Sequence, residues 1–311
     1  MIPVEPDLDH ASEGKCTNQR PIVRPHHPRL CQTLIRRGFF MPNFALQAAQ
    51  NLTAVRNTQP LVHNITNFVV MNFTANLLLA CGASPVMAHA ENEVEDMVAI
   101  AQALVLNIGT LEDSWVTAML KAAKAATRLH KPVVLDPVGA GATPLRTQAA
   151  LAILAQGQIK VLRGNASEIL ALAQKNVHTK GVDAYGHTED IVATVQALAL
   201  KHNITVAVTG PTDLVTDGQR TLLIQGGHPL MPKITGTGCS ASALVGAFLA
   251  VDPDPVTAAS SALAYLAVAG KRAGATALGP GSFQTQFLDT LYSLTPQELA
   301  DQAVIHESSH A

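Results

Sequence analysis

A turn of two glycines, a threonine and a cysteine begins at Gly236 and is followed by the small and apolar run SASALVGAFLAV. The run predicts a helix, and the first turn of a helix offers unpaired backbone N–H groups and the positive end of the helix dipole. Gly236 and Gly238 allow a phosphate to approach that backbone closely, because neither has a Cβ atom. Cys239 follows at the helix start, where we expect the dipole to lower the thiol pKa. The motif predicts an anion site at the start of the helix. Beside it, Cys239 could orient or deprotonate the hydroxyl of a substrate that attacks the bound group.

Two other interpretations of this turn are open. Glycines before a helix also permit tight turning, and a cysteine can fill a small space in a core. The stretch Gly236–Ala241 also matches the dinucleotide fingerprint G-x-G-x-x-[GA]. That fingerprint joins the first strand of a βαβ unit to its helix, whereas here the turn lies late in the chain and a second helix follows. No Walker A sequence occurs, which excludes a P-loop kinase.

Three other polar residues come directly after apolar, strand-like runs. Asp136 closes VVLD, Arg163 follows IKVL, and Thr209 ends VAVT. In an open α/β sheet the ligand lies beyond the carboxyl ends of the strands, so we expect these side chains to share one site with the GTGC turn. Glu168 belongs to the segment NASE before an apolar helix, a pattern that is also typical of a helix capping box.

The elements that must position these residues alternate between strand-like and helix-like segments from about Pro60 onward, which predicts a mostly parallel sheet with helices on both faces. We expect strands in PLVHNIT, SPVMA, ALVLNIG, PVVLD, IKVLRG and ITVAVTG, and a hairpin in DLVTDGQRTLLIQGG. Helices are expected in MPNFALQAAQNLTAVR, over 67–80, 91–102, 113–130, 145–156, 165–174 and 187–201, in the run after GTGC, over 256–273, and after GPGSF.

Composition narrows the class of protein. The 311 residues are 48% apolar and 14% charged, and the formal net charge is −2. No block of Lys and Arg occurs, so binding to nucleic acid or to an anionic membrane has no electrostatic support. No apolar run reaches the roughly 18 residues that would predict a membrane span. The low charge is typical of a chain with a large subunit interface, and the four cysteines, which lack metal or disulfide spacing, favour reduced thiols in a cytosolic protein.

Taken together and in order, six segments resemble the hydroxyethylthiazole kinases: PLVHNITNFVVMNFTANLLLACGASPVMAHA, VVLDPVGAGAT, RGNASEILAL, VAVTGPTDLVTDG, GGHPLMPKITGTGCSASALVGAF and GPGSFQTQFLD. The resemblance implies a single-domain α/β protein of the ribokinase-like fold. It also implies that ATP, with Mg²⁺, phosphorylates the hydroxyl of 4-methyl-5-(2-hydroxyethyl)thiazole in thiamine salvage. Enzymes of this family are homotrimers with active sites between subunits, and we expect a cytoplasmic protein.

The same resemblance implies roles for individual residues. Met87 and Gly236 match positions that contact the thiazole, while Arg163 and Thr209 match ATP-binding positions. Cys239 stands where related sugar kinases carry a catalytic aspartate, and it is the expected catalytic residue. Without the resemblance, Met87 would be interpreted as a core residue at a strand end.

Two carboxylates are implied as magnesium ligands. Glu168 matches the N-x-x-E motif that organises the ion and its waters, and Asp136 is the second candidate. Mg²⁺ keeps several waters, so Glu168 can act through one of them. Asn64 and Asn67 either line the thiazole pocket or cap a turn.

The resemblance places the catalytic domain at residues 41–305. Residues 1–40 are rich in Pro, His and charge and lack periodicity, so we expect a disordered extension or a misassigned start. Other functions stay open at this point: a hydroxymethylpyrimidine kinase, an ATP-dependent dehydratase that repairs hydrated NAD(P)H, or a thiazole-binding module without catalysis.

Overall fold

The strands form one sheet in the computed structural model, which describes residues 43–156, 158–173 and 189–308. The expectation for residues 1–40 lies outside these residues. In the described part the sheet has nine strands in the order β2-β1-β3-β4-β5-β6-β7-β8-β9. Strands β1 to β6 are parallel, and β7, β8 and β9 are antiparallel to their neighbours. Their bounds are β1 (Leu61–Ile65), β2 (Ser84–Val86), β3 (Ala103–Asn107), β4 (Val133–Asp136), β5 (Ile159–Asn165), β6 (Thr205–Thr209), β7 (Thr212–Thr216), β8 (Thr221–Gln225) and β9 (Val304–Glu307).

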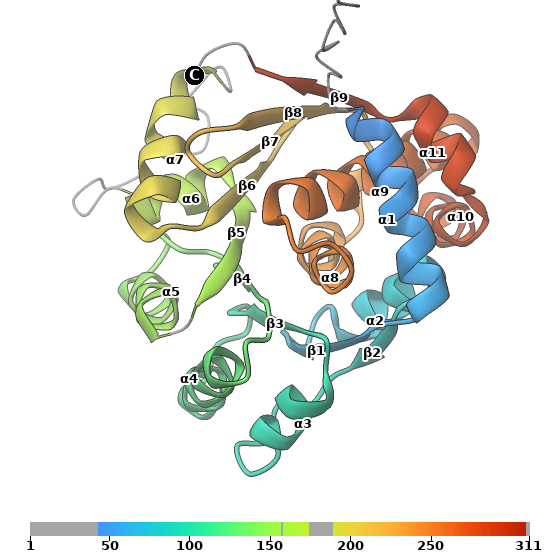
Figure 1. Cartoon of the computed structure of the whole chain (residues 1–311). Coiled ribbons are helices and arrows are strands. Elements are labelled where there is room, and N and C mark those ends of the chain that lie inside the picture. Colours follow the sequence, from blue (N-terminus) through green and yellow to red (C-terminus); the bar gives the residue numbers. More distant parts are fainter. Residues whose placement is uncertain (1–42, 157, 174–188, 309–311) are drawn as a thin grey trace, which may run out of the picture. The chain divides into compact units, whose positions relative to one another are not determined.

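Helices cover both faces of the sheet, as the alternating pattern predicted (Figure 1). One face carries α1 (Phe44–Thr58), α2 (Met71–Cys81), α8 (Thr237–Leu249), α9 (Pro255–Thr276), α10 (Pro280–Ser293) and α11 (Pro296–Gln302). The other carries α3 (Val94–Ile100), α4 (Asp113–Arg128), α5 (Pro144–Gln156), α6 (Ala166–Ala173) and α7 (Glu189–His202). Within the described residues, no helix is both long and apolar enough to cross a membrane.

The alternation of side chains along the parallel strands divides the core between the two faces. Val105 of β3 and Val134 of β4 pack in the cluster beneath α8 and α9, whereas Leu104 and Leu135 pack beneath α3 to α7. Successive residues of a strand point to opposite faces, so a sheet buried on both sides is apolar at every position. This explains why the predicted strands are continuous apolar runs.

The pairing of the strands brings their polar last residues into line. Asn107 at the end of β3 is paired with Asp136 at the end of β4, and Asn165 of β5 is paired with Thr209 of β6. The carboxyl ends of these parallel strands therefore present a row of polar side chains at one edge of the sheet.

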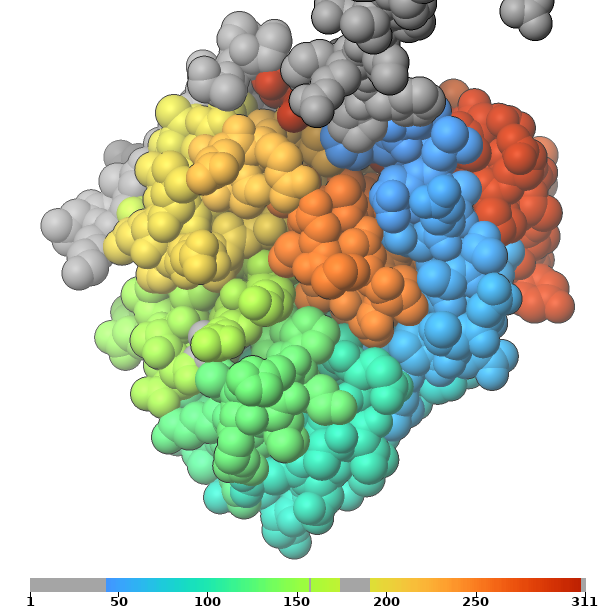
Figure 2. Space-filling model, in the orientation of Figure 1, coloured from blue at the N-terminus to red at the C-terminus, as the bar shows by residue number. Residues whose placement is uncertain are grey.

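Helix α8 runs unusually close to this sheet. A Cβ atom added at Gly246 would lie 2.7 Å from Cγ2 of Val105, a distance that side chains do not tolerate. The small residues of α8 are thus required for the helix to reach the strands. Figure 2 shows part of the α8–α9 segment, in orange, at the surface between α1, in blue, and the gold segment that contains β7 and β8.

Helix α1 is tied to the loop between α8 and α9 by a buried asparagine. Asn51 donates hydrogen bonds from Nδ2 to Oδ2 of Asp252, at 2.7 Å, and to Oγ of Ser261, at 3.1 Å. Asn43 caps the helix by accepting a hydrogen bond from the backbone N–H of Leu46, at 3.1 Å. A buried polar group needs partners, so the two bonds of Asn51 fix where α1 lies.

The predicted elements differ from the structure in several bounds, most of all at the start of α2, and two elements were not predicted. Helix α2 begins at Met71 rather than Asn67, because Asn67 to Val70 form a turn closed by a hydrogen bond from Val70 N to Asn67 O. The helix ends before Gly82, as expected, with φ at +100°. Helix α11 and strand β9 were not predicted. Both are short, and β9 is an edge strand that depends on pairing with β8.

Candidate active site

The GTGC turn forms the start of α8. Gly236 is the N-cap residue with φ at +90°, and a Cβ atom there would lie 3.0 Å from Cδ1 of Phe73. This position requires glycine for both its backbone angle and its space. The first backbone bond of the helix runs from Ser240 N to Gly236 O, at 2.8 Å. The N–H groups of Thr237, Gly238 and Cys239 therefore have no partner within the helix, which makes this end of α8 suited to an anion.

Arg163 lies against the same turn. A Cβ atom at Gly238 would be 3.0 Å from Nη1 of Arg163, so the absence of a side chain makes room for the guanidinium. Arg163 donates a hydrogen bond from Nη2 to Oγ1 of Thr209, and its Nη1 lies 3.5 Å from Oδ2 of Asp136. The side chain is 6% exposed. Arg163, on β5, thus contacts residues of β4, β6 and α8.

Asp136 is a carboxylate in an almost dry environment. Its Oδ2 accepts hydrogen bonds from Nδ2 of Asn107, at 2.9 Å, and from Oγ of Ser242, at 2.7 Å. Its Oδ1 is buried and has no partner among the described residues. Burial raises the pKa of Asp136 to about 6, although the charge of Arg163 opposes this rise.

The expectation that the helix dipole would lower the thiol pKa of Cys239 is wrong. Burial, together with the neighbouring carboxylate of Asp136, raises that pKa to about 11. Nδ2 of Asn67 donates a hydrogen bond to the sulfur at 3.5 Å, which favours the thiolate but does not offset burial. The thiol of Cys239 is therefore protonated at neutral pH.

Glu168 forms the capping box that the sequence suggested as one alternative. Its Oε2 accepts from Asn165 N, at 2.9 Å, while Asn165 Oδ1 accepts from Glu168 N, at 2.9 Å. Its Oε1 accepts a further bond from Gly139 N, at 2.9 Å. Each carboxylate oxygen has already accepted one backbone N–H. The side chain nevertheless faces the small cavity described next, so its capping role leaves lone pairs free.

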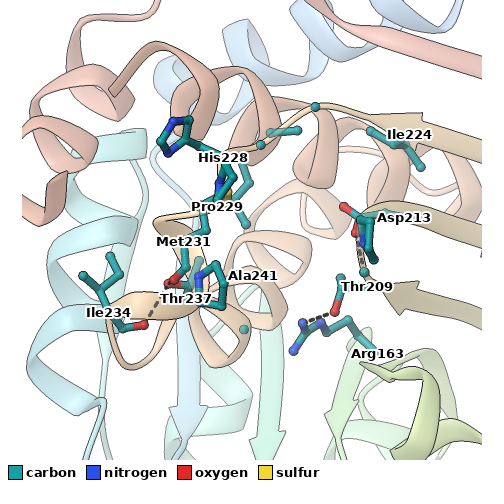
Figure 3. Close-up of a pocket in the computed structure, with 18 of the residues that line it drawn as sticks. Arg163, Thr209, Asp213, Ile224, His228, Pro229, Met231, Ile234, Thr237 and Ala241 are labelled. Carbon is teal, nitrogen blue, oxygen red and sulfur yellow. Dashed lines mark hydrogen bonds between the residues drawn. The ribbon is translucent and has the colours of Figure 1, made fainter. Parts of the chain in front are cut away.

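Two cavities meet at the GTGC turn. The larger has a volume of about 730 Å³, and the smaller, about 170 Å³. Arg163, Gly236 and Gly238 line both. In Figure 3, Arg163 and Thr209 lie at one end of the larger cavity and His228 and Pro229 at the other. Its volume suits a ligand of several hundred daltons.

The two cavities differ in chemistry. Apolar residues form much of the larger one, including Ile224, Met231, Ile234 and Leu266. The smaller one is lined by the side chains of Asp136, Arg163, Asn165, Glu168 and Cys239. It therefore concentrates charged and nucleophilic groups that the sequence placed at strand ends, as for Asp136 and Arg163, and at helix starts, as for Glu168 and Cys239.

Met87 is not brought to either cavity. It follows β2 at the edge of the sheet and is partly buried. The structure thus brings together six of the seven predicted site residues, Asp136, Arg163, Glu168, Thr209, Gly236 and Cys239, and leaves Met87 apart.

Residues that the sequence analysis missed also reach the site. Asp213 lines the larger cavity, its Oδ1 accepts from Gly210 N at 2.9 Å, and burial raises its pKa to about 6. Asn107 and Ser242 hold Asp136. Asn107 ends a strand just as Asp136 does, so the strand-end rule could have identified it. Asp213 lies inside a hairpin, where no such rule applies.

No group of three or more His, Cys, Asp or Glu side chains in the described residues is placed to hold a metal ion. A metal in the smaller cavity would therefore depend on few protein ligands. Asp136 Oδ1, buried and without a partner, and the oxygens of Glu168 are oxygen donors that suit Mg²⁺, which retains most of its waters.

A comparison with known proteins agrees with this geometry. A sequence model described as the Hydroxyethylthiazole kinase family matches residues 52–297. A hydroxyethylthiazole kinase from Desulfotalea psychrophila is 56% identical over 269 residues, which cover 86% of this chain and 98% of that protein.

Solved structures support the same relationship. A hydroxyethylthiazole kinase protein from Pyrococcus horikoshii superimposes with a TM-score of 0.78 at 47% identity, covering 84% of this chain and 99% of that one. A ribokinase-like superfamily protein from Enterococcus faecalis, at 13% identity and a TM-score of 0.57, covers 82% and 96% and shares the fold alone. The fold is ribokinase-like, and the chain belongs to the hydroxyethylthiazole kinase family.

Proposed function

We propose that this chain transfers the γ-phosphoryl group of ATP to the hydroxyl of 4-methyl-5-(2-hydroxyethyl)thiazole, as expected of thiamine salvage. The observation that carries the proposal is the meeting of the two cavities at Arg163 and the GTGC turn. A nucleotide-sized space and a small, charged space then adjoin the same helix N-terminus, which is the arrangement that a phosphoryl transfer needs. Membership of the family supports the choice of substrate.

The larger cavity would hold ATP. Its apolar wall, with Met231 and Leu266, suits a base, and Arg163 and Thr209 lie at the end where phosphates would reach the turn. A guanidinium binds phosphate oxygens with two hydrogen bonds, and its hydrogen bond to Thr209 fixes its direction. The N–H groups at the start of α8 would stabilise the charge on the phosphoryl group during transfer.

Mg²⁺ would be held in the smaller cavity by Asp136 and, through water, by Glu168. Bound there, the ion would supply positive charge that offsets the negative charge developing on the phosphates. The residues fit this role because the unpartnered Asp136 Oδ1 supplies one oxygen ligand, while the Glu168 oxygens, which already accept backbone bonds, can accept from waters of the ion.

The hydroxyl of the thiazole alcohol would attack the γ-phosphorus from the side of Cys239. A new O–P bond forms, and the bond from the γ-phosphorus to the bridging oxygen of ADP breaks. Because burial raises the pKa of Cys239 to about 11, the thiol orients the hydroxyl rather than removing its proton before attack. In a loose transition state the proton leaves late and passes to an oxygen of the transferred phosphoryl group or to water, so an ionised base is not needed at the start.

We propose that the thiazole end of the site is completed by a neighbouring subunit. Gly236 lies at the junction of the cavities, whereas Met87 lines neither, so one subunit does not assemble both predicted thiazole contacts. A homotrimer with sites between subunits would supply the missing surface.

Both cysteines in the described residues, Cys81 and Cys239, are free thiols, which suits a protein that works in the reducing cytoplasm.

The test is an assay of ADP release from ATP in the presence of Mg²⁺ and one alcohol at a time. The thiazole alcohol should support turnover, and hydroxymethylpyrimidine should not. The opposite preference would support the pyrimidine kinase alternative. Calorimetric binding of the thiazole alcohol without any ADP release would instead support a module that has lost catalysis. Sedimentation of the enzyme checks the trimer independently.

A further inference from the structure

Asn107 occupies the centre of a buried hydrogen-bond chain at the carboxyl edge of the sheet. Its Oδ1 accepts from the backbone N–H of Gly109, at 3.0 Å, and from Nδ2 of Asn67, at 2.9 Å. Its Nδ2 donates to Oδ2 of Asp136, at 2.9 Å. The side chains of Asn67, Asn107 and Asp136 are all at most 4% exposed.

The direction of this chain is fixed by one unambiguous donor. A backbone N–H can only donate, so the atom of Asn107 that faces Gly109 must be the carbonyl oxygen. The amide nitrogen of Asn107 must then face Asp136, and the remaining lone pair of Oδ1 must be met by the nitrogen of Asn67. That same nitrogen of Asn67 donates to Sγ of Cys239. One backbone amide thus orients two asparagines, a carboxylate and a thiol.

Gly109 supports the chain in a second way. A Cβ atom added at this residue would lie 2.6 Å from Nδ2 and 2.8 Å from Cγ of Asn67. Its φ is not in the left-handed region, so glycine is required here for space rather than for its backbone angle. The side chain of Asn67 is packed onto Gly109 and is held there while it contacts Cys239.

We propose that Asn107 is a positioning residue for phosphoryl transfer, which holds Asp136 directly and Cys239 through Asn67, with Gly109 as the surface that keeps Asn67 in place. The proposal rests on the proposed function of the site. It explains why an uncharged amide that lines neither cavity is buried beside the reacting groups. Displacements of about 1 Å at reacting groups can cost about a hundredfold in rate.

Two variants disrupt the hydrogen-bond chain at different residues. Asn107→Leu removes all three hydrogen bonds and keeps the branching at Cγ, and Gly109→Ala displaces Asn67 while leaving Asn107 in place. Both should lower kcat at least tenfold. In Gly109→Ala the KM for ATP should change less than threefold, because neither Gly109 nor Asn67 lines the ATP cavity, whereas Asn107→Leu also loosens Asp136, the proposed magnesium ligand. A smaller loss of kcat in either folded variant, or a parallel rise in the KM for ATP in Gly109→Ala, would overturn the proposal.

The matched control is Asn51→Leu. Asn51 is also a buried asparagine that donates to a buried carboxylate, Asp252, but it lies on α1 away from the cavities. This variant should lower the melting temperature and change kcat less than threefold. If it lowers kcat as much as Asn107→Leu does, the effect of Asn107 is general destabilisation and the positioning role is wrong.

A double-mutant cycle tests the link through Cys239. In a Cys239→Ala background, Gly109→Ala should lower kcat less than threefold further, because the thiol that Asn67 positions is gone. An undiminished tenfold effect would show that Gly109 acts by another route.

A readout without substrate separates this proposal from the proposed function. The rate at which iodoacetamide modifies Cys239, followed by mass spectrometry of its peptide, should change at least threefold in Gly109→Ala and less than threefold in Asn51→Leu. If the parent enzyme proves inactive on the thiazole alcohol, the proposed function fails. The comparison of modification rates still decides whether the hydrogen-bond chain positions Cys239. A change of less than threefold in Gly109→Ala would contradict the positioning of Cys239.

Discussion

Replacing Asp136 by asparagine should stabilise the folded protein and abolish its proposed activity. The pKa of this carboxyl is about 6 in the folded chain, against an ordinary value of 3.8, chiefly because it is buried. A shift of about two units corresponds to about 3 kcal/mol. At pH 8 the carboxylate is charged in both the folded and the unfolded protein, so the folded protein is destabilised by the full penalty of burying that charge. Asparagine has no charge to desolvate, so Asp136→Asn should raise the free energy of unfolding by about 3 kcal/mol at pH 8.

The pH dependence of this difference follows from the direction of the shift. The pKa of Asp136 is higher in the folded state, so between pH 4 and 6 the folded protein binds more protons and the stability of the parent falls as the pH rises. The gain from Asp136→Asn should be absent near pH 4, grow up to about pH 6, and stay constant above that.

The measurement is urea unfolding of both proteins at pH 4.5, 6 and 8, with a chelator present and without nucleotide. Asp254→Asn serves as a control of opposite sign, because hydrogen bonds from Arg220 hold the pKa of Asp254 below its ordinary value. That variant should lose stability at pH 8 and lose less of it at low pH. The reasoning would be refuted if Asp136→Asn were less stable than the parent at pH 8. It would also be refuted if the difference in free energy of unfolding did not change with pH.

Three further outcomes are expected. Cys239→Ala should lower kcat tenfold to a hundredfold without abolishing it, and the shape of the kcat pH profile should not change. An unchanged kcat would contradict the orienting role of Cys239. Loss of one limb of the pH profile would indicate that the thiol acts as a base. Arg163→Ala should raise the KM for ATP at least tenfold in steady-state assays, more than it lowers kcat, and a loss confined to kcat would contradict phosphate binding by Arg163. In the parent, Cys239 should react with iodoacetamide at pH 7.5 more slowly than free glutathione, because burial raises its pKa to about 11, and a faster reaction would contradict that.

Much of the fold could be predicted because its signals are local. Each parallel strand is an apolar run bounded by polar or glycine residues. Strand register brings the residues that end these runs, such as Asp136 and Thr209, to the same edge of the sheet. Helix α11 and strand β9 escaped because they are short, and because β9 exists through its pairing with a strand about 80 residues earlier in the chain.

The electrostatics of the site could not be predicted in the same way. A helix start predicts a lowered thiol pKa, but Cys239 is buried beside Asn67, Asn107 and Asp136, which the motif does not contain, and burial outweighs the dipole. Glu168 illustrates a different limit, because the same N-x-x-E spacing serves both a capping box and a metal site. The roles of all seven predicted site residues, Met87 and Glu168 included, stay predictions.

The anchoring of α1 has a practical consequence for any shortened version of the chain. The family match starts at residue 52, yet α1 starts at Phe44, and Asn51 is one of the side chains that satisfy the buried Asp252. Trimming to the boundary of the family match would delete half a helix and leave that carboxylate short of a donor. A polypeptide initiated at Met41 would keep the whole of α1 with its Asn43 cap, so recombinant production could omit the first forty residues without cutting into this anchor.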